Sequence, residues 1–140
     1  MKYRIGLLSL GILALLGAGC EVTTANLQNV KMCSALVDYQ CAEDTVEFSS
    51  DTPELFLTAL LQNAVEGTVV NYSWYYLGEQ GTEEPYEIDS VDFTKKEGDQ
   101  QEVYGSLSIP DNGWPVGAYQ VVLQIKADNV DPITKEFSIK

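Results

Sequence analysis

The chain has 140 residues, of which 45% are hydrophobic, 21 are acidic, 8 are basic and none is histidine. That length suits one domain with one hydrophobic core. The formal net charge of −13 repels phosphate groups, so we expect no nucleic-acid partner, and the lack of histidine excludes Ser-His-Asp and Cys-His catalysis.

Residues 1–19 have the pattern of a secretory signal peptide. Lys2 and Arg4 form a short positive segment, and a mostly apolar run follows from Ile5 to Leu16. A bilayer-spanning helix needs about 20 apolar residues, so this run is too short to cross a membrane comfortably. The sequence therefore predicts export out of the cytoplasm.

The small residues Gly17, Ala18 and Gly19 run directly into Cys20 and resemble the lipobox of bacterial lipoproteins. The resemblance implies cleavage before Cys20 and attachment of diacylglycerol to its sulfur, although the usual leucine three residues before the cysteine is here Gly17. The alternatives are an ordinary signal peptide cut near Gly19, which would release the domain, or an uncleaved anchor. Glu21 slightly favours the outer membrane by the same resemblance.

Removal of the signal would remove two basic residues and no acidic ones, which leaves 6 basic and 21 acidic residues and a net charge of −15. If Cys20 carries lipid, Cys33 and Cys41 remain as an even pair in an oxidising compartment, which favours a disulfide between them. Two free buried thiols are the alternative. Two isolated thiols without histidine make a metal site improbable, so we expect no metal.

Residues 20–29 are polar and without periodicity, and they predict a tether between the lipid and a domain at 30–140. Short runs of β-forming residues begin at Val30, and the first two strands are expected at 30–37 and 45–48. Residues 54–62 (ELFLTALLQ) would also suit a helix, but the neighbouring strands favour a strand.

The clearest strand is 68–77, in which Val70, Tyr72, Trp74 and Tyr76 fall on one face. Further strands are expected at 86–93, 102–109, 117–127 and 133–139. Seven or eight short strands without a long helical period predict an all-β protein, a single antiparallel β-sandwich.

Trp74 on a mid-chain strand and the Gly117-x-Tyr119 run near the end resemble immunoglobulin-like and fibronectin-III-like domains. The resemblance implies an immunoglobulin-like sandwich in which the Tyr119 hydroxyl bonds back to the backbone at a corner. The longer run Gly-Trp-Pro-x-Gly-x-Tyr at 113–119 resembles a recurring bacterial envelope domain, and Trp114 is expected to pack at the base of the sandwich. A resemblance of fold is silent on activity.

No catalytic residue and no cofactor can be assigned, because the sequence has no G-x-S-x-G elbow, no phosphate loop and no EF-hand spacing. Asp128 with Asp131, or Asp111 with Asn112, could offer oxygen ligands to Ca²⁺, but these residues are also the usual turn formers. Exposed tyrosines are a further hint, because Tyr75 or Tyr86 could stack on a sugar or a peptide.

The sequence thus favours a non-enzymatic lipoprotein of the cell envelope, held at the membrane by its lipid anchor and facing away from the cytoplasm, at the outer membrane or cell surface. We expect a binding module for an envelope protein or a glycan. The alternative is a structural or accessory subunit of an envelope complex or surface layer, with no diffusible ligand. A cleft with exposed aromatic residues would favour the binding module, and a large apolar patch would favour the structural subunit.

Overall fold

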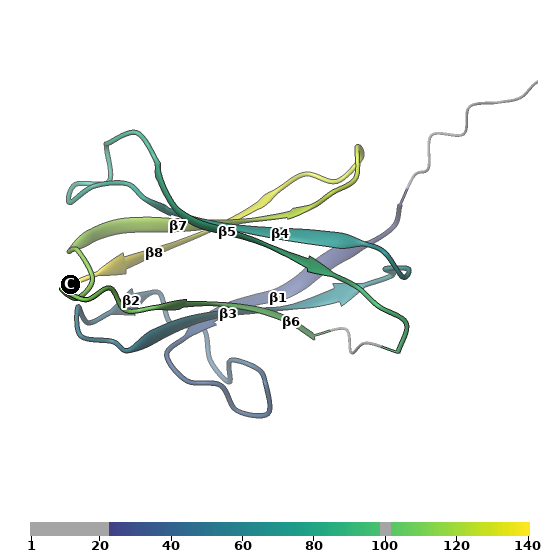
Figure 1. The fold of residues 1–140 in the computed structure, drawn as a ribbon, viewed down its shortest axis with the longest axis horizontal. Helices are drawn as coiled ribbons and strands as arrows, with labels where there is room; N and C mark the ends of the chain where they lie inside the picture. The colour runs from purple at the N-terminus through teal and green to yellow at the C-terminus, as the bar shows by residue number, and fades with distance from the viewer. Residues whose placement is uncertain (1–22, 99–101) are drawn as a thin grey trace, which may run out of the picture.

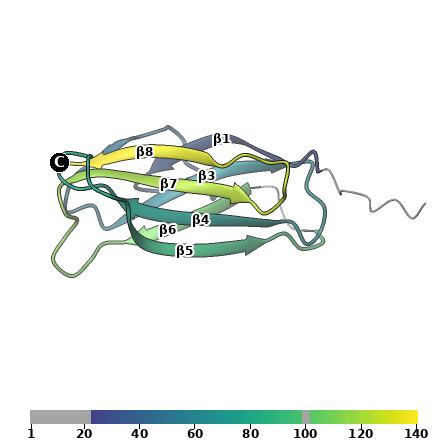
Figure 2. The same ribbon diagram turned by 90° about the horizontal axis from the view of Figure 1, so that it is seen from above.

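A computed structural model describes residues 23–98 and 102–140, which form two packed β-sheets (Figures 1 and 2). One sheet has the order β1-β3-β6 and contains β1 (Asn26–Cys33), β3 (Glu54–Gln62) and β6 (Glu102–Ser108). The other has the order β2-β8-β7-β4-β5 and contains β2 (Glu47–Phe48), β8 (Ile133–Ile139), β7 (Gly117–Ile125), β4 (Val69–Tyr76) and β5 (Tyr86–Thr94). The predicted all-β sandwich of seven to eight strands is confirmed.

The core forms where the alternating apolar residues of the two sheets meet. Along β7, Gly117, Tyr119, Val121, Leu123 and Ile125 are buried, and the residues between them are partly exposed. Successive side chains of a strand point to opposite faces, so this period of two places one face of the strand in the core. The strand at 68–77 behaves in the same way, with Val70, Tyr72 and Trp74 buried from β4.

The segment that could have been a helix is strand β3, with the bounds Glu54–Gln62 that the sequence suggested. Leu55, Leu57, Ala59 and Leu61 are all buried and alternate with residues of the other face. β3 is also the central strand of its sheet, paired with β1 on one side and β6 on the other. Cross-strand pairing and burial thus override the helix propensity of leucine and alanine.

The expected tether is shorter than residues 20–29, because the domain begins well before Val30. β1 starts at Asn26, and Ala25 is already buried. Thr23 and Asn129 exchange two hydrogen bonds: the Thr23 N–H donates to Oδ1 of Asn129 (3.3 Å), and Nδ2 of Asn129 donates to the Thr23 carbonyl (2.8 Å).

The sequence at 21–29 shows no regular apolar pattern although β1 begins there, because β1 is an edge strand with an irregular register. Its pairing with β3 shifts between Gln28 and Lys31, and Asn29 has a φ of 52°. Such a bulge interrupts the two-residue period. β1 also ends at Cys33, four residues before the expected end at Val37, because the chain leaves the sheet there and Val37 is exposed.

The predicted disulfide between Cys33 and Cys41 is confirmed. It closes a loop that projects from the three-stranded sheet (Figure 1), and the Cys41 N–H donates to the Thr58 hydroxyl on β3. In the chain-entropy model, a loop of this size contributes about 2.5 kcal/mol to stability by restricting the unfolded chain. The bridge therefore holds a loop that has little core of its own.

One lateral side of the sandwich is closed by the chain itself. After β1, the chain crosses to the other sheet, where β2 pairs in parallel with β8. Asp44 helps to fix this crossing, since it accepts the Met32 N–H (2.9 Å) and forms an ion pair with Lys135. Burial alone would raise the pKa of Asp44, but these two hydrogen bonds hold it below its usual value.

The close contact between β7 and the loop after β4 requires glycine at position 117. Gly117 has a φ of 143°, and a Cβ there would lie 2.4 Å from the Gly78 carbonyl oxygen. The Ala118 N–H donates to that same carbonyl (3.0 Å), so the two segments cannot move apart without losing the bond.

We therefore expect Gly117→Ala to lower the free energy of unfolding by about 3 kcal/mol, through backbone strain and overpacking together. Gly67→Ala is the matched control, because Gly67 also has a positive φ but a Cβ there would meet nothing within 4 Å. Its expected cost is about 1 kcal/mol. Urea unfolding of both variants measures the difference, and equal losses would show that the contact with Gly78 is unimportant.

Candidate functional site

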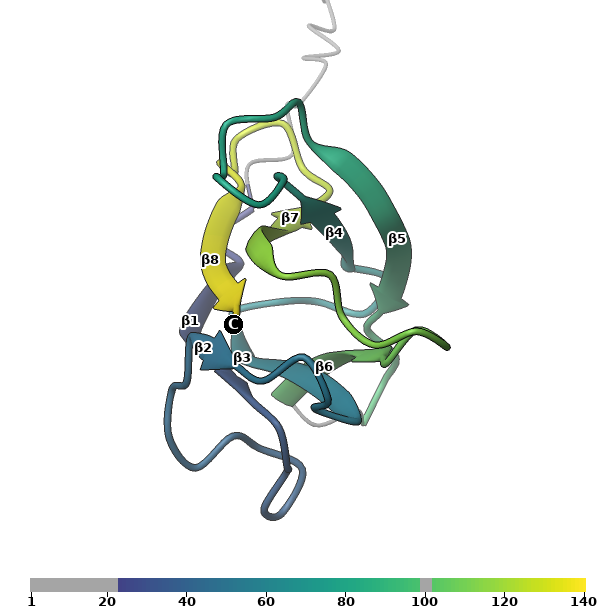
Figure 3. The same cartoon turned by 90° about the vertical axis from the view of Figure 1, so that its left-hand side faces the viewer.

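The two lateral sides of the sandwich differ, and the open side is the candidate site. On that side the sheets end in two unpaired edges, β5 from the five-stranded sheet and β6 from the three-stranded sheet. The end-on view shows β5 curving down toward β6 (Figure 3). The chain passes from β5 to β6 here, and no described strand lies between the two edges.

β5 is unusual because neither of its faces is covered. Eight of its nine residues are exposed and the remaining one, Phe93, is only partly buried. Val91 and Tyr86 leave 51% and 70% of their surface in contact with solvent. A strand in a sandwich normally buries one face, so β5 presents apolar side chains without a partner inside the described domain.

A cleft of about 510 Å³ lies between β5 and β6. Its lining is mainly apolar and comes from β4, β5 and β6: Tyr72, Trp74, Val91, Asp92, Phe93, Glu102, Tyr104, Gly105 and Ser106. A volume of this order is in the range of ligand pockets in proteins.

Gly105 makes the cleft possible. Along β6, Val103 and Leu107 are buried, and Gly105 lies between them on the same inward face. A Cβ at Gly105 would contact the ring of Tyr72 at 3.4 Å and that of Trp74 at 3.8 Å. A larger side chain at this position would occupy space between the sheets, so the glycine leaves the cleft open.

Tyr72 lines the cleft and carries a hydroxyl that no described residue satisfies. Its side chain is 2% exposed, and the hydroxyl oxygen is enclosed in the core. Burial accordingly raises the pKa of Tyr72 well above its usual value, so the hydroxyl stays protonated. An unsatisfied buried hydroxyl costs about 1–3 kcal/mol.

The surroundings of β5 are strongly acidic. From Gly78 to Thr94 the chain carries six acidic residues and no basic one; the six are Glu79, Glu83, Glu84, Glu87, Asp89 and Asp92. Glu102 adds a carboxylate on the β6 side of the cleft. Lys126 neutralises part of this charge at Asp92, and Lys95 and Lys96 follow β5 directly. The acidic surface therefore lies along the loop before β5 and the first half of the strand, where it favours a positively charged molecule.

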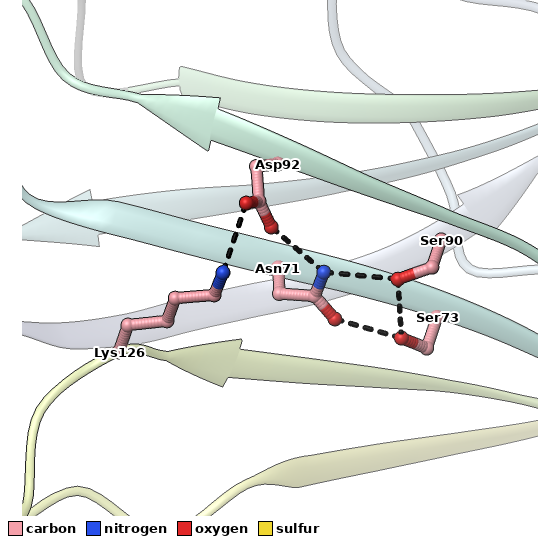
Figure 4. Close-up of polar contacts among 5 residues, drawn as sticks. All are labelled: Asn71, Ser73, Ser90, Asp92 and Lys126. Atoms are coloured by element: carbon pink, nitrogen blue, oxygen red, sulfur yellow. Dashed lines mark hydrogen bonds and ion pairs between the residues drawn. The ribbon is translucent and has the colours of Figure 1, made fainter.

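Hydrogen bonds, rather than burial, hold β5 on the sheet (Figure 4). Nδ2 of Asn71 on β4 donates to the Ser90 hydroxyl (3.0 Å) and to Oδ1 of Asp92 (2.8 Å), and the Ser73 hydroxyl donates to Oδ1 of Asn71 (2.7 Å). Asp92 also forms an ion pair with Lys126 (2.9 Å). These contacts stabilise the paired strands on their outer face.

The hydrogen bond from Asn71, together with that from Lys126, holds the pKa of Asp92 below its usual value. The carboxylate is thus ionised and already engaged at neutral pH. The network uses its donors and acceptors internally, and we interpret it as a structural support for β5. The exposed face of the cleft, not this network, offers free surface to a partner.

The residues expected at the structural corner lie in the core. Trp74 is 1% exposed, and Trp114 is buried with its Nε1 donating to the Thr52 carbonyl (2.7 Å). The Tyr119 hydroxyl donates to the Pro115 carbonyl, which is the bond that the resemblance implies. Cys20, the expected lipid attachment site, lies outside the described residues, so its lipidation stays a prediction.

Other hints from the sequence have separate outcomes. Tyr86 is exposed at the start of β5 and is not part of the cleft lining, whereas Tyr75 is half-buried. Asp111 and Asp128 lie in turns, in agreement with their role as turn formers.

Within residues 23–98 and 102–140, no group of three or more His, Cys, Asp or Glu is placed to hold a metal ion. The part of the chain that the structure describes contains no helix long and apolar enough to span a membrane.

Sequence patterns alone could not locate the cleft. Its lining comes from three strands, and the decisive features are the missing side chain at Gly105 and the absence of a strand beside β5. The one available signal was the composition of β5 (YEIDSVDFT), in which acids interrupt the apolar alternation that a covered strand would show.

Comparison with known proteins identifies the fold and nothing narrower. No family model matches the chain. No curated protein matches it either. An immunoglobulin-like protein from Pseudomonas aeruginosa has a similar solved structure, with a TM-score of 0.56 and 11% identity over 82% of this chain and 97% of that one. The fold is an immunoglobulin-like β-sandwich.

A β-glucosidase from Listeria innocua, solved in complex with glucose, aligns over 82% of this chain with 9% identity and a TM-score of 0.47. The match covers 15% of the glucosidase chain. The same enzyme in complex with laminaribiose gives 10% identity and a TM-score of 0.48. This chain therefore spans only a small part of the glucosidase.

Two buried tyrosines allow a direct test of the unpaired hydroxyl. We expect Tyr72→Phe to raise the free energy of unfolding by about 1 kcal/mol, because it removes a buried donor without a partner. Tyr119→Phe is the matched control, since the same change removes a hydrogen-bonded hydroxyl and should lower stability by about 1 kcal/mol. Thermal unfolding measures both, and a loss in both variants would show that the Tyr72 hydroxyl has a partner in solution.

Proposed function

We propose that this chain is a non-enzymatic, lipid-anchored binding module that works outside the cytoplasm and uses the open side of its sandwich to engage a partner. The observation that carries the proposal is the cleft between β5 and β6, bordered by a strand whose residues are exposed on both faces. The export signal and the lipobox-like Gly17–Cys20 run support the location.

The exposed apolar residues favour a binding module over a purely structural subunit. Tyr86, Ile88 and Val91 on β5 and Tyr104 on β6 are all exposed, and Val91 and Tyr104 line the cleft. They surround a concave surface with polar and acidic groups at its rim. A subunit that only stabilises an assembly would more often present a larger, continuous apolar patch.

The chemistry of the cleft supports binding and does not suggest catalysis. Its ionisable groups are the buried Tyr72, the carboxylates of Asp92 and Glu102, and the exposed Tyr104. The raised pKa of Tyr72 keeps its hydroxyl protonated, so it does not supply a base, and Asp92 is engaged with Asn71 and Lys126. Nucleophilic catalysis needs a side chain within reach of an activating base, and this lining supplies no such pair.

The corrected start of the domain sets how the sandwich would stand on a membrane. Thr23 is fixed against Asn129, so only residues 20–22 would separate the lipid from the folded domain. Three residues reach at most about 10 Å. The end of the sandwich near Asn129 would then face the bilayer, and the cleft would open sideways, parallel to the membrane surface.

The lipid anchor is tested by Cys20→Ser in the natural host. We expect the wild-type protein in the membrane fraction, with an intact mass equal to residues 20–140 plus diacylglycerol on sulfur, less two hydrogens for the disulfide. Cys20→Ser should move the protein to the soluble fraction, because its acyl chains supply about 0.8 kcal/mol per buried CH₂. The control is the double variant Cys33→Ser/Cys41→Ser, which should remain in the membrane; retention of Cys20→Ser there would count against the anchor.

The binding surface is tested by photo-crosslinking in the same host. A benzophenone amino acid at Tyr104, which is 51% exposed in the cleft, should give a discrete adduct with a partner. The matched position is Val37, which is 60% exposed but lies in the disulfide-closed loop. Adducts from Val37 alone, or none from Tyr104, would move the function away from the open side.

A further inference from the structure

We propose that the partner is a basic, extended protein segment that pairs with the free edge of β5 and becomes the next strand of the five-stranded sheet. The proposal rests on the proposed function and names the class of partner. In such a complex, the added strand would lay alternate apolar side chains over the cleft and carry lysine or arginine on its other face.

The backbone of β5 supplies the first argument. β5 pairs with β4 on one side over residues from Tyr86 to Thr94, and it is the last strand of its sheet. On its other side it offers backbone N–H and C=O groups to an incoming strand, although the Ser90 N–H already donates to Oδ1 of Asp89 (2.9 Å). Adding a strand at such an edge is a common mode of peptide recognition.

Proteins usually protect an exposed edge, and β5 has only part of that protection. Its register against β4 shifts between Trp74 and Tyr75, which leaves Ile88 as the extra residue of a bulge. The strand contains no proline and no lysine, the residues that most often block strand addition. From Asp89 to Thr94 the register is continuous, so this half of the strand is a regular template.

The negative charge of β5 determines which kind of strand can pair with its free edge. Glu87, Asp89 and Asp92 are its ionisable carboxylates, and no cation lies within the strand. A second copy of this chain would bring the same acidic edge against its own, which repulsion disfavours. A basic segment is attracted instead, so the acids act both against self-association and in favour of a cationic partner.

The register predicts the pattern of the partner. Val91 pairs with Tyr72 and Phe93 with Val70, so these β5 residues share the inward face of β4 and point over the cleft. Glu87 pairs with Tyr75 and Asp92 with Asn71, which places both acids on the outward face. A partner strand should therefore alternate apolar residues, facing the cleft, with basic residues on the outward face beside Glu87. Asp92 is already paired with Lys126.

The cleft beside β5 offers the partner an apolar surface. Its lining includes Tyr72, Trp74, Val91 and Phe93, and Gly105 adds no side chain over the two core rings. Alternate apolar side chains of an added strand would pack there. The Tyr72 hydroxyl is enclosed in the core and is not a contact for the added strand.

The experiment uses the full-length protein purified from host membranes in a nonionic detergent. The probe is a blocked nine-residue peptide of alternating lysine and valine, and the control peptide has glutamate in place of each lysine. Affinity and amide hydrogen exchange are measured for both. We expect only the lysine peptide to bind, with slower exchange of β5 amides and at least tenfold weaker binding in high salt.

Two double variants with the same change in charge separate the site from general attraction. Glu84→Lys/Glu87→Lys alters exposed acids at the start of β5 and should weaken peptide binding about tenfold or more. Glu43→Lys/Glu136→Lys alters exposed acids away from the open side and should leave the affinity within twofold. Equal losses in the two double variants would overturn the proposal, because binding would then follow net charge alone.

The exchange data separate this inference from the proposed function. Peptide-induced protection of β5 amides supports strand addition. Chemical-shift changes confined to Tyr104 and Gly105, without protection of β5, would overturn strand addition while leaving a cleft that binds. No binding of the lysine peptide would also overturn the inference, and the crosslinking at Tyr104 would still decide whether the open side has a partner.

Discussion

The packing of Phe137 in the middle of an aromatic cluster is the constraint on which the rest of the sandwich depends. Its ring lies 6.1 Å from the ring centroids of Phe48 and Trp74 and 5.1 Å from that of Tyr119. Those residues belong to β2, β4 and β7, so one side chain of β8 packs against side chains from three other strands. Aromatic pairs at these separations add stabilisation beyond the area they bury, and this cluster fixes where β2 must lie.

The position of β2 gives the domain its two unlike sides. With β2 held against β8, the chain between β1 and β2 has to cross from one sheet to the other, and the disulfide loop and Asp44 support that crossing. The chain also passes from one sheet to the other between β5 and β6, but no described strand lies between these two edges. The core is therefore sealed on one side and accessible on the other, and the cleft follows from this difference.

Much of the fold was predictable because its strands bury one face. In the 68–77 and 117–127 segments, large apolar or aromatic residues occupy every second position on the core face, and both segments are central strands. The seven buried ones are Val70, Tyr72, Trp74, Tyr119, Val121, Leu123 and Ile125. The start of β1 was not predictable, because an edge strand with a bulge at Asn29 carries no regular apolar pattern. The cleft was equally hidden: it depends on which strands become edges, a property of the topology and not of any local run of residues.

The polar support of β5 has a consequence for the dynamics of the domain. β5 is held by its ladder to β4 and by the contacts of Asn71, Ser90 and Asp92, while it contributes almost no buried apolar surface. Regions of that kind separate from a native structure at a lower free-energy cost than global unfolding requires. The strand can thus detach and return while the aromatic cluster stays intact. A molecule that binds only the attached form would make this opening rarer as its concentration or affinity rises. Binding at the open side would then increase the local order of β5 and leave the rest of the sandwich unchanged.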